Sequence, residues 1–156
     1  MPELKKTHIV KHSAIDMFDL VCDIEKYPEF VPLVQRLNVR SHKERGDKKL
    51  VMAAMTMGYL AIQETFTTQV FMNQKALEID VSYIDGPFEY LENTWSFHAL
   101  SDSSCEIHFH VNYALKNKML AAAAGAVFDR AFSRFVNAFE ERADTIYKKN
   151  APENRG

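Results

Sequence analysis

Cysteine is scarce in this chain, and its scarcity narrows the kinds of site that the protein can contain. The 156 residues include only two cysteines, Cys22 and Cys105, and neither belongs to a CxxC pair or to a Cys/His ligand spacing. This pattern argues against a structural zinc site. Isolated cysteines within apolar patterns also indicate a reducing, intracellular environment.

Long apolar runs are missing as well. The longest covers residues 119–127, which is too short to span a bilayer and is soon followed by Asp129 and Arg130. The first ten residues, MPELKKTHIV, contain no apolar segment of the kind that secretory signals carry. We therefore expect a cytoplasmic protein that can lie peripherally at the inner membrane.

Neither sign of charge dominates the sequence. Nineteen Lys and Arg residues oppose 21 Asp and Glu residues, which leaves a formal net charge of -2. So small a net charge exerts no long-range attraction on nucleic acid or anionic lipid, and we do not expect DNA as a partner. Local basic clusters are compatible with this balance.

Apolar residues, in contrast, are plentiful. Hydrophobic residues make up 47% of the chain and aromatic residues 12%, which is typical of a folded protein with a core. A chain of this length buries about 70% of the surface that it exposes when unfolded. No repeat or linker interrupts the pattern, so we expect one domain over residues 1–149 and a frayed tail over residues 150–156.

Hydrophobic periodicity predicts the order of the elements. Residues 4–10 alternate as a strand, and Ser13 and Asp16 have the spacing of a capping box before a short helix. Pro28 and Pro32 predict a short helical turn or loop. The links between the later apolar runs are short, which favours antiparallel hairpins because parallel strands need long crossovers. Period-two runs occupy residues 34–42, 48–57, 60–72, 76–84, 88–100 and 104–115, and a helical pattern occupies 118–148.

This order predicts an α+β fold, in which a curved antiparallel sheet wraps around a long C-terminal helix. A sheet that is apolar on one face must cover that face, and the last helix is the only predicted element large enough to do so. The apolar stripe expected on this helix consists of Met119, Ala123, Val127, Ala131 or Phe132, Phe135, Phe139, Arg142 or Ala143, and Ile146.

The most informative turn lies between the fourth and fifth runs. Gly86 tolerates positive φ, and Pro87 fixes its own φ and removes a ladder N–H. The strand that follows carries the only tryptophan, Trp95. Leu91, Trp95 and Phe97 differ by even numbers, so we expect them on one face of that strand.

These motifs resemble those of the START-like polyketide cyclase/dehydrase superfamily, in the branch that holds coenzyme Q-binding proteins and ribosome association toxins. The likeness extends over about residues 4 to 147, and it departs at Leu33-Val34, where that branch often has Trp-Cys. The residues that carry it are Ser13-Ala14, Met17-Phe18-Asp19-Leu20-Val21, Tyr27-Pro28-Glu29-Phe30-Val31-Pro32, Glu64 with Phe66, Asp85-Gly86-Pro87-Phe88, Leu91, Trp95, Phe97, Ala138-Phe139-Glu140 and Arg142-Ala143.

The resemblance implies a helix-grip fold (START/Bet v1-like) with an apolar cavity between the sheet and the C-terminal helix. It also implies a non-enzymatic protein that carries ubiquinone (coenzyme Q) or another lipid, or presents it for respiratory electron transport, with transient membrane contact. The quinone would be a bound ligand, and no cofactor is expected. The residues expected to face the cavity are Val51, Met55, Ile62, Glu64, Phe66, Tyr83, Leu91, Trp95, Phe109, Tyr113, Val127 and Phe135.

Glu64 is the polar residue that most needs an explanation. It shares its parity with Ile62 and Phe66, so a regular strand would direct the carboxylate inward, where it needs a partner or a raised pKa. The alternative is a β-bulge or an edge position that turns Glu64 toward solvent or a loop N–H.

The sequence supports neither a metal site nor a catalytic site. His108 and His110 lie on one strand face, but metal sites need three or more convergent ligands. Cys22 and Cys105 lie in apolar registers, where a thiol is typically inert. A cyclase-like enzyme would need two convergent acid/base groups, and only Glu64 is a candidate.

The toxin branch suggests an alternative function, in which the protein binds the large ribosomal subunit and blocks subunit association. Such a protein needs a basic surface for phosphate contacts. Lys43, Arg45, Lys48 and Lys49 cluster around one predicted hairpin turn. A solvated turn explains the same cluster, so both interpretations stand.

Overall fold

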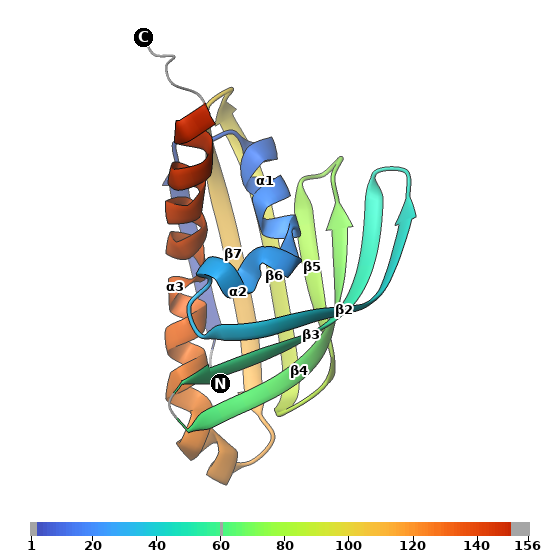
Figure 1. Cartoon of the computed structure of the whole chain (residues 1–156), viewed down its shortest axis with the longest axis vertical. Coiled ribbons are helices and arrows are strands. Elements are labelled where there is room, and N and C mark those ends of the chain that lie inside the picture. The colour runs from blue at the N-terminus through green and yellow to red at the C-terminus, as the bar shows by residue number, and fades with distance from the viewer. Residues whose placement is uncertain (1–2, 60, 151–156) are drawn as a thin grey trace.

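The fold was analysed in a computed structural model, which describes residues 3–59 and 61–150. Seven strands and three α-helices follow one another along the chain (Figure 1). They are β1 (Glu3–Val10), α1 (Ala14–Cys22), the 3-10 helix η1 (Ile24–Lys26), α2 (Tyr27–Phe30), β2 (Val34–Arg45), β3 (Lys48–Tyr59), β4 (Ile62–Asn73), β5 (Glu78–Asp85), β6 (Phe88–Ser101), β7 (Ser104–Leu115) and α3 (Lys118–Asn150).

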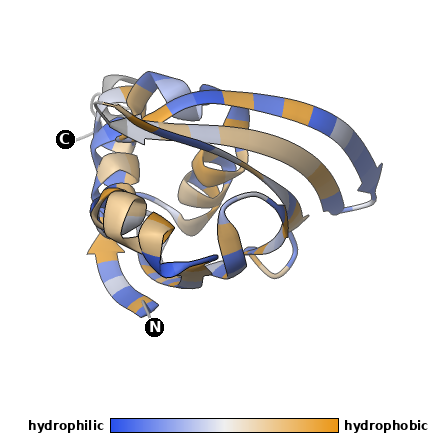
Figure 2. Cartoon of the chain, turned by 90° about the horizontal axis from the view of Figure 1, so that it is seen from below, coloured by the Kyte–Doolittle hydropathy of each residue, from blue (hydrophilic) through white to orange (hydrophobic). Residues whose placement is uncertain are grey.

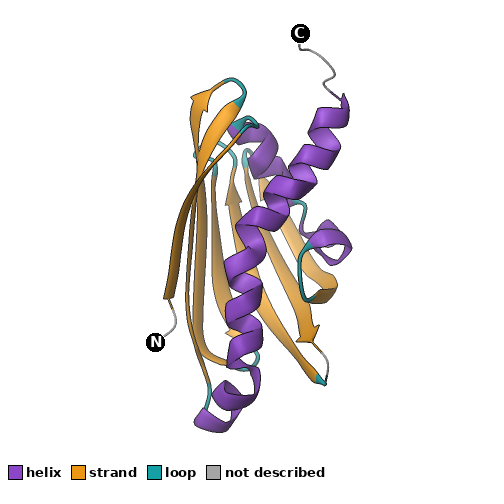
Figure 3. Ribbon diagram, turned by 90° about the vertical axis from the view of Figure 1, so that its left-hand side faces the viewer, coloured by secondary structure: helices purple, strands orange, loops and turns teal. Residues whose placement is uncertain are grey.

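The strands form one antiparallel sheet in the order β1-β7-β6-β5-β4-β3-β2, so β1 and β2 are its edges. The sheet curls, and α3 runs diagonally across its concave face (Figures 2 and 3). The helices α1 and α2 lie over the same face (Figure 1). The predicted α+β helix-grip architecture and its antiparallel hairpins are therefore confirmed.

Several predicted boundaries differ from the structure; for example, β2 continues to Arg45 rather than ending at residue 42. The strand β5 begins at Glu78 rather than at residue 76, because Leu77 has a φ of 55° and cannot continue an extended strand. The helix α3 continues through Asn150, where the tail was expected to begin, and residues 151–156 lie outside the described residues. Residue 60, where β4 was expected to start, also lies outside them.

The turn between β5 and β6 packs closely against β4. Gly86 has a φ of 144°, and a Cβ atom added there would lie 2.5 Å from Cβ of Phe66. The backbone N–H of Phe88 donates to the Tyr83 hydroxyl at 3.0 Å. A register shift between Phe88 and Tyr90 then lets both Phe88 and Leu91 face the core, although they differ by an odd number. The turn therefore needs a glycine for its backbone conformation and for space.

Polar contacts cap α1 and hold α2 against α3. Ser13 caps α1 by accepting from the Asp16 N–H at 3.1 Å, as the capping spacing predicts. Arg142 on α3 donates to Glu29 on α2 at 2.7 Å, and its guanidinium carbon lies 4.9 Å from the centre of the Phe30 ring. Glu29 and Arg142, which lie 113 residues apart in the chain, thus form one contact that holds α2 over the concave face.

The first turns of α3 do not bury the residues that the stripe predicts. Met119 is 83% exposed and Ala123 is exposed, while Ala124 and Phe128 are fully buried. The predicted stripe began as a ladder of four-residue steps, and each such step drifts about 40° around a helix of 3.6 residues per turn. The C-terminal half of the stripe faces the sheet, so the accumulated drift turns its N-terminal end, at Met119, away from the sheet.

No helix among the described residues combines the length and the apolar character needed to cross a bilayer.

Candidate ligand cavity

An enclosed cavity of about 60 Å³ lies between the concave face of the sheet and α3. Its walls come from α2, from the four strands β3 to β6, and from α3. The lining residues are Tyr27, Met55, Phe66, Thr68, Val70, Ile79, Val81, Leu91, Asn93, Trp95, Phe132 and Phe135.

Strand register explains the apolar wall. Met55 pairs with Phe66, Val70 pairs with Val81, and Ile79 pairs with Trp95. Residues directly opposite each other in an antiparallel ladder share a face, so each pair adds two side chains to the same wall. The period-two pattern of the sequence therefore becomes a continuous apolar surface across four strands.

Trp95 is both a wall of the cavity and a support for α3. Its ring packs edge-on against Phe109 of β7 at 4.7 Å and against Phe139 of α3 at 5.3 Å, centre to centre. Its indole N–H donates to Asn93 Oδ1 at 3.2 Å, and the Asn93 amide donates to the carbonyl oxygen of His110 at 2.8 Å. These bonds hold a polar amide at the edge of an apolar cavity.

The polar groups of the lining are few and uncharged. They are the hydroxyls of Thr68 and Tyr27 and the amide of Asn93. Tyr27 donates to the carbonyl oxygen of Val21, and burial raises the pKa of its phenol well above the ordinary value. The lining contains no carboxylate, imidazole, amine, guanidinium or thiol, so it offers orientation by hydrogen bonds rather than acid–base chemistry.

A larger groove opens on the other side of α3, between that helix and strands β1 and β7. It has a volume of about 630 Å³, with an apolar floor that includes Leu4, Val111 and Phe132 and a rim that includes Arg130 and Arg134. Phe132 lines both the groove and the enclosed cavity. Its side chain is therefore part of the partition between them.

The Tyr113 hydroxyl donates to Asp129 in the wall of this groove. Burial, with a further contribution from that hydrogen bond, raises the pKa of the Tyr113 phenol above its ordinary value. The phenol is thus a fixed donor that ties β7 to α3.

The structure brings together some of the residues expected to face the cavity and separates others from it. Val51, Phe109 and Tyr113 are buried in the core beside the cavity, and Ile62, Tyr83 and Val127 are half-buried outside its lining. Val127 lies outside the lining because the first half of α3 is rotated relative to the predicted stripe. Those that do line the cavity are Met55, Phe66, Leu91, Trp95 and Phe135.

Glu64 was expected either to point into the cavity or to be turned outward by a bulge or edge position, and the structure matches neither expectation completely. The β3–β4 ladder runs without a register shift and pairs Glu64 with Met57, whose side chain belongs to the core. Glu64 therefore shares the concave face, and no bulge turns it outward. It lies near the start of β4, half-buried and outside the cavity lining.

Sequence reasoning missed Tyr27, Thr68, Val70, Ile79, Val81, Asn93 and Phe132 as lining residues. Strand parity could have identified Val70, Ile79 and Val81, since each shares the face of a residue already selected. Phe132 was predicted only as an alternative to Ala131 in the helix stripe, and Tyr27 was not selected, because their positions depend on how α2 and α3 dock.

The cysteines and histidines do not form a reactive or metal-binding centre in the described part of the chain. Burial raises the pKa of Cys22 to about 12 and that of Cys105 to about 11, so both remain thiols at neutral pH. His108 contacts Glu106 at 2.9 Å and His110 contacts Glu3 at 2.8 Å. No group of three or more metal-ligating side chains occurs among residues 3–59 and 61–150.

Two sequence relatives cover most of this chain. It is 34% identical to the ribosome association toxin RatA of Escherichia coli (strain K12), over 94% of this chain and 90% of that protein. It is 32% identical to the mitochondrial coenzyme Q-binding protein COQ10 of Drosophila melanogaster, over 86% of this chain and 55% of that protein.

Solved structures share the fold. The solution structure of the 18 kDa protein CC1736 from Caulobacter crescentus is 31% identical with a TM-score of 0.76, and the likeness covers 94% of this chain and 99% of that one. The Zhui aromatase/cyclase from Streptomyces sp. R1128 has a TM-score of 0.78 over 98% of both chains, and at 12% identity this likeness concerns the fold alone.

A sequence profile of one family matches residues 10–140. The match spans every strand from β2 to β7, Glu29, which binds Arg142, and all the residues that line the enclosed cavity. The chain belongs to the polyketide cyclase/dehydrase and lipid transport family.

Proposed function

We propose that this protein binds a ubiquinone-type isoprenoid quinone between the sheet and α3, and carries or presents it without converting it. The observation that carries the proposal is the enclosed cavity, which is apolar on four strands and one helix and has only uncharged polar groups. Burying an isoprenoid tail there would stabilise the complex by roughly 25 cal/mol per Å² of apolar surface removed from water. The Thr68 hydroxyl and the Asn93 amide could orient the head group.

The size of the cavity sets a condition on this function. Pockets for small-molecule ligands generally measure about 300–1,000 Å³, and the enclosed cavity measures about 60 Å³. Binding therefore requires the cavity to expand, and Phe132, which separates the cavity from the groove, is the side chain whose movement would expand it. If its ring swings aside, the cavity joins the groove of about 630 Å³ beside β1 and β7, and that groove would take the tail.

The composition of the lining supports binding rather than catalysis. Cyclisation or dehydration needs an acid and a base that converge on the substrate. The lining supplies none, and Glu64, the carboxylate that the sequence nominates, lies outside it. A ligand held there would leave unchanged.

The first test is solvent extraction of the purified protein followed by mass spectrometry, with a second arm in which ubiquinone is added. Trp95 is the only tryptophan and lies in the cavity wall, so added quinone should quench its fluorescence in a saturable way. Val81→Trp, which fills the cavity, should abolish saturable binding; with two tryptophans present, this variant is measured by co-purification of added quinone. No quinone in the extract and no saturable quenching by the unaltered protein would contradict the proposal.

A second candidate function is association with the large ribosomal subunit. Its specific support is the toxin relatives, which match nearly the whole chain, together with the exposed basic hairpin of β2 and β3. Overexpression should then reduce joined ribosomes in a sucrose-gradient profile and increase free subunits. An unchanged profile would reject this function and leave quinone binding unaffected.

A further inference from the structure

The convex face of the sheet, which faces away from the cavity and α3, carries a different chemistry. Five exposed cations lie on the β2–β3 hairpin, at Arg36, Arg40, Lys43, Arg45 and Lys48. In sequence, Arg36 and Lys43 differ by an odd number, so a regular strand would place them on opposite faces.

A β-bulge brings them to one face. Arg36 pairs with Thr56, the register shifts between Val39 and Ser41, and Lys43 then pairs with Leu50. The even-numbered residues of β3 face away from the core, which receives Val51, Ala53 and Met57 instead. Their partners on β2 therefore point outward on both sides of the bulge.

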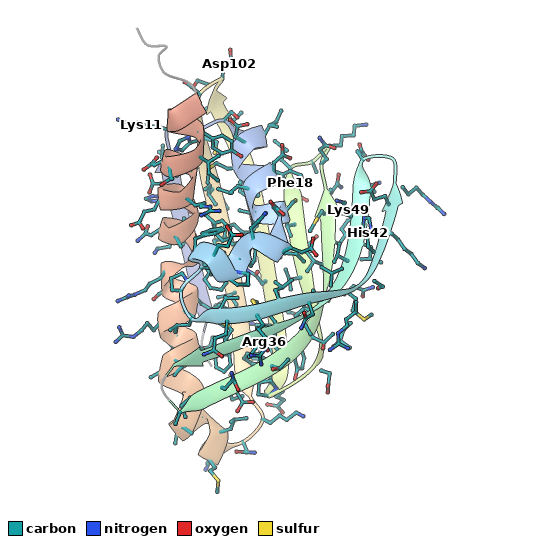
Figure 4. All side chains as sticks on the ribbon, viewed as in Figure 1. Lys11, Phe18, Arg36, His42, Lys49 and Asp102 are labelled. Atoms are coloured by element: carbon teal, nitrogen blue, oxygen red, sulfur yellow. The ribbon has the colours of Figure 1, made fainter. Side chains whose placement is uncertain are left out.

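The same register places Arg45 opposite Lys48, and Arg40 is the extra residue of the bulge. Arg36 to Arg45 spans about 30 Å at the usual rise of roughly 3.3 Å per residue. Figure 4 shows Arg36 and the His42–Lys49 end of the hairpin along one continuous arm. The result is a row of positive charge along the edge of the sheet.

Carboxylates are kept off this row. Glu44 pairs across the hairpin with Lys49 on the concave side, where its Oε2 lies 3.2 Å from Lys49 Nζ and 3.2 Å from His42 Nε2. Among the described residues, no ion pair engages any of the five cations of the row. The nearest carboxylate along the chain outside the ion pairs is Asp47, at the tip of the turn.

The adjoining strand β4 adds neutral groups. Its outward residues Thr65, Thr67, Gln69 and Phe71 pair with outward residues of β3 and bear no charge. The first outward carboxylates, Glu78, Asp80 and Asp85, appear one strand further on. We define the basic convex face as Arg36, Arg40, Lys43, Arg45 and Lys48 together with Gln69 and Phe71.

We propose that the basic convex face docks RNA through its phosphate backbone. The proposal deepens the second candidate function, on which it rests, by naming the surface. Spaced cations without carboxylate partners suit a polymer of phosphates, and Gln69 and the half-buried Phe71 supply a hydrogen-bonding side chain and an aromatic ring beside them.

Other occupants fit less well. The most exposed large apolar side chains, such as Ile9, Leu100 and Met119, lie outside this face. Phe71 and the neighbouring Leu50 are only half-exposed, so a bilayer would find no projecting apolar anchor. A second copy of the chain would bring like charges together. The bulge and the edge cations also oppose the addition of another strand to β2.

The test compares two variants that each lose five positive charges. One carries Gln at Arg36, Arg40, Lys43, Arg45 and Lys48. The matched control carries Gln at Lys5, Lys11, Lys75, Lys116 and Lys118, which are exposed and lie outside this face. Binding to a fluorescent 20-nucleotide single-stranded RNA, and to purified large ribosomal subunits, is measured by titration at several salt concentrations.

The first variant should bind RNA at least tenfold more weakly than the unaltered protein. The slope of log affinity against log salt should fall in magnitude by up to about 3.5, since each of five phosphate contacts on single strands contributes about 0.7. The control should keep both values. Equal losses in the two variants, or no loss in the first, would overturn the proposal; so would binding to anionic vesicles, at matched salt, that depends on these five residues while RNA binding does not.

Two further outcomes separate the surface from the function. If the first variant loses RNA binding but still increases free subunits on overexpression, the face docks RNA but does not act in subunit association, and the assignment of this surface to the second candidate function is overturned. If the unaltered protein binds RNA through this face but leaves ribosome profiles unchanged, the surface is supported and the ribosome function is rejected. Trp95 fluorescence and thermal unfolding verify that both variants fold.

Discussion

The concave and convex faces of the sheet share the same strands but present opposite chemistry. On β3 alone, Val51 and Ala53 pack into the core around α3, while Lys48 faces solvent beside the cations of β2. Alternation at every second residue allows one strand to serve both an apolar cavity and a charged surface. The comparison teaches that one sheet can present an apolar cavity on one face and a charged surface on the other, with residues that can be altered separately.

The largest effect on stability should come from removing a core side chain on the concave side of the sheet. Phe139 is fully buried, and its ring lies 5.1 Å from the rings of both Tyr27 and Phe30. Phe139→Ala should lower the free energy of unfolding by about 3–5 kcal/mol, because it leaves a cavity that several aromatic rings must span. Phe71→Ala on the convex face is the control and should cost much less. Similar losses in denaturant titrations would show that the two faces contribute equally to stability.

Filling the cavity should separate the two binding functions. Val81→Phe places a larger side chain into about 60 Å³ of space and should weaken quinone binding at least tenfold, or about 1.4 kcal/mol. RNA binding should not change, since Val81 lies on the opposite face from the basic row. Val39→Phe, on exposed β2, is the matched control for quinone titration by fluorescence. A parallel loss of RNA binding by Val81→Phe would mean that the faces are coupled.

A smaller effect is expected from the partition between cavity and groove. Phe132→Leu keeps the site apolar but shortens the side chain of the partition, and should cost less stability than Phe139→Ala because less buried volume is removed. Quinone uptake, followed by stopped-flow quenching of Trp95, should become several-fold faster with affinity nearly unchanged. Phe128→Leu, one turn earlier on α3 and outside both linings, should leave the rate unaltered. Equal rates in the unaltered protein and Phe132→Leu would place the access path elsewhere.

The smallest effect concerns Glu44, whose carboxylate lies on the concave side because Glu44 pairs with Lys49. Hydrogen bonds from Lys49 and then His42 lower the pKa of Glu44 below its usual value. Their contribution to stability is therefore present at neutral pH and is lost as the pH falls through the lowered pKa. Lys49→Met should move that pKa upward toward its usual value in a carboxyl NMR titration, with little change in unfolding or RNA affinity. A marked loss of RNA binding would place Lys49 in the docking surface.

Much of the fold was predictable because its signals are local. The alternation of β7, the turn at Gly86 and Pro87, and the apolar spacing in the C-terminal half of the last helix each follow from neighbouring residues, and the structure confirms them. Bulges were not predictable in this way. The bulge after Val39 and the one after Phe88 each reverse the parity of a strand, so faces assigned by counting fail beyond them.

The cavity was predictable only in part for the same reason. Met55, Phe66, Leu91 and Trp95 were found because strand parity is a local property, whereas Phe132 depends on the rotation of α3 and Tyr27 on the docking of α2. That docking relies on the contact between Glu29 and Arg142, which lie 113 residues apart in the chain. No periodicity reaches across such a distance.

The sequence by itself determined the order of the elements, the apolar face of most strands and the long helix that covers them, because periodicity and turn chemistry act over a few residues. Tertiary structure alone decided which residues enclose the cavity, how small it is, and that cations from both sides of a bulge share one face. Those features depend on register and on the packing of distant side chains, where a rotation of 40° or a shift by one residue changes the outcome.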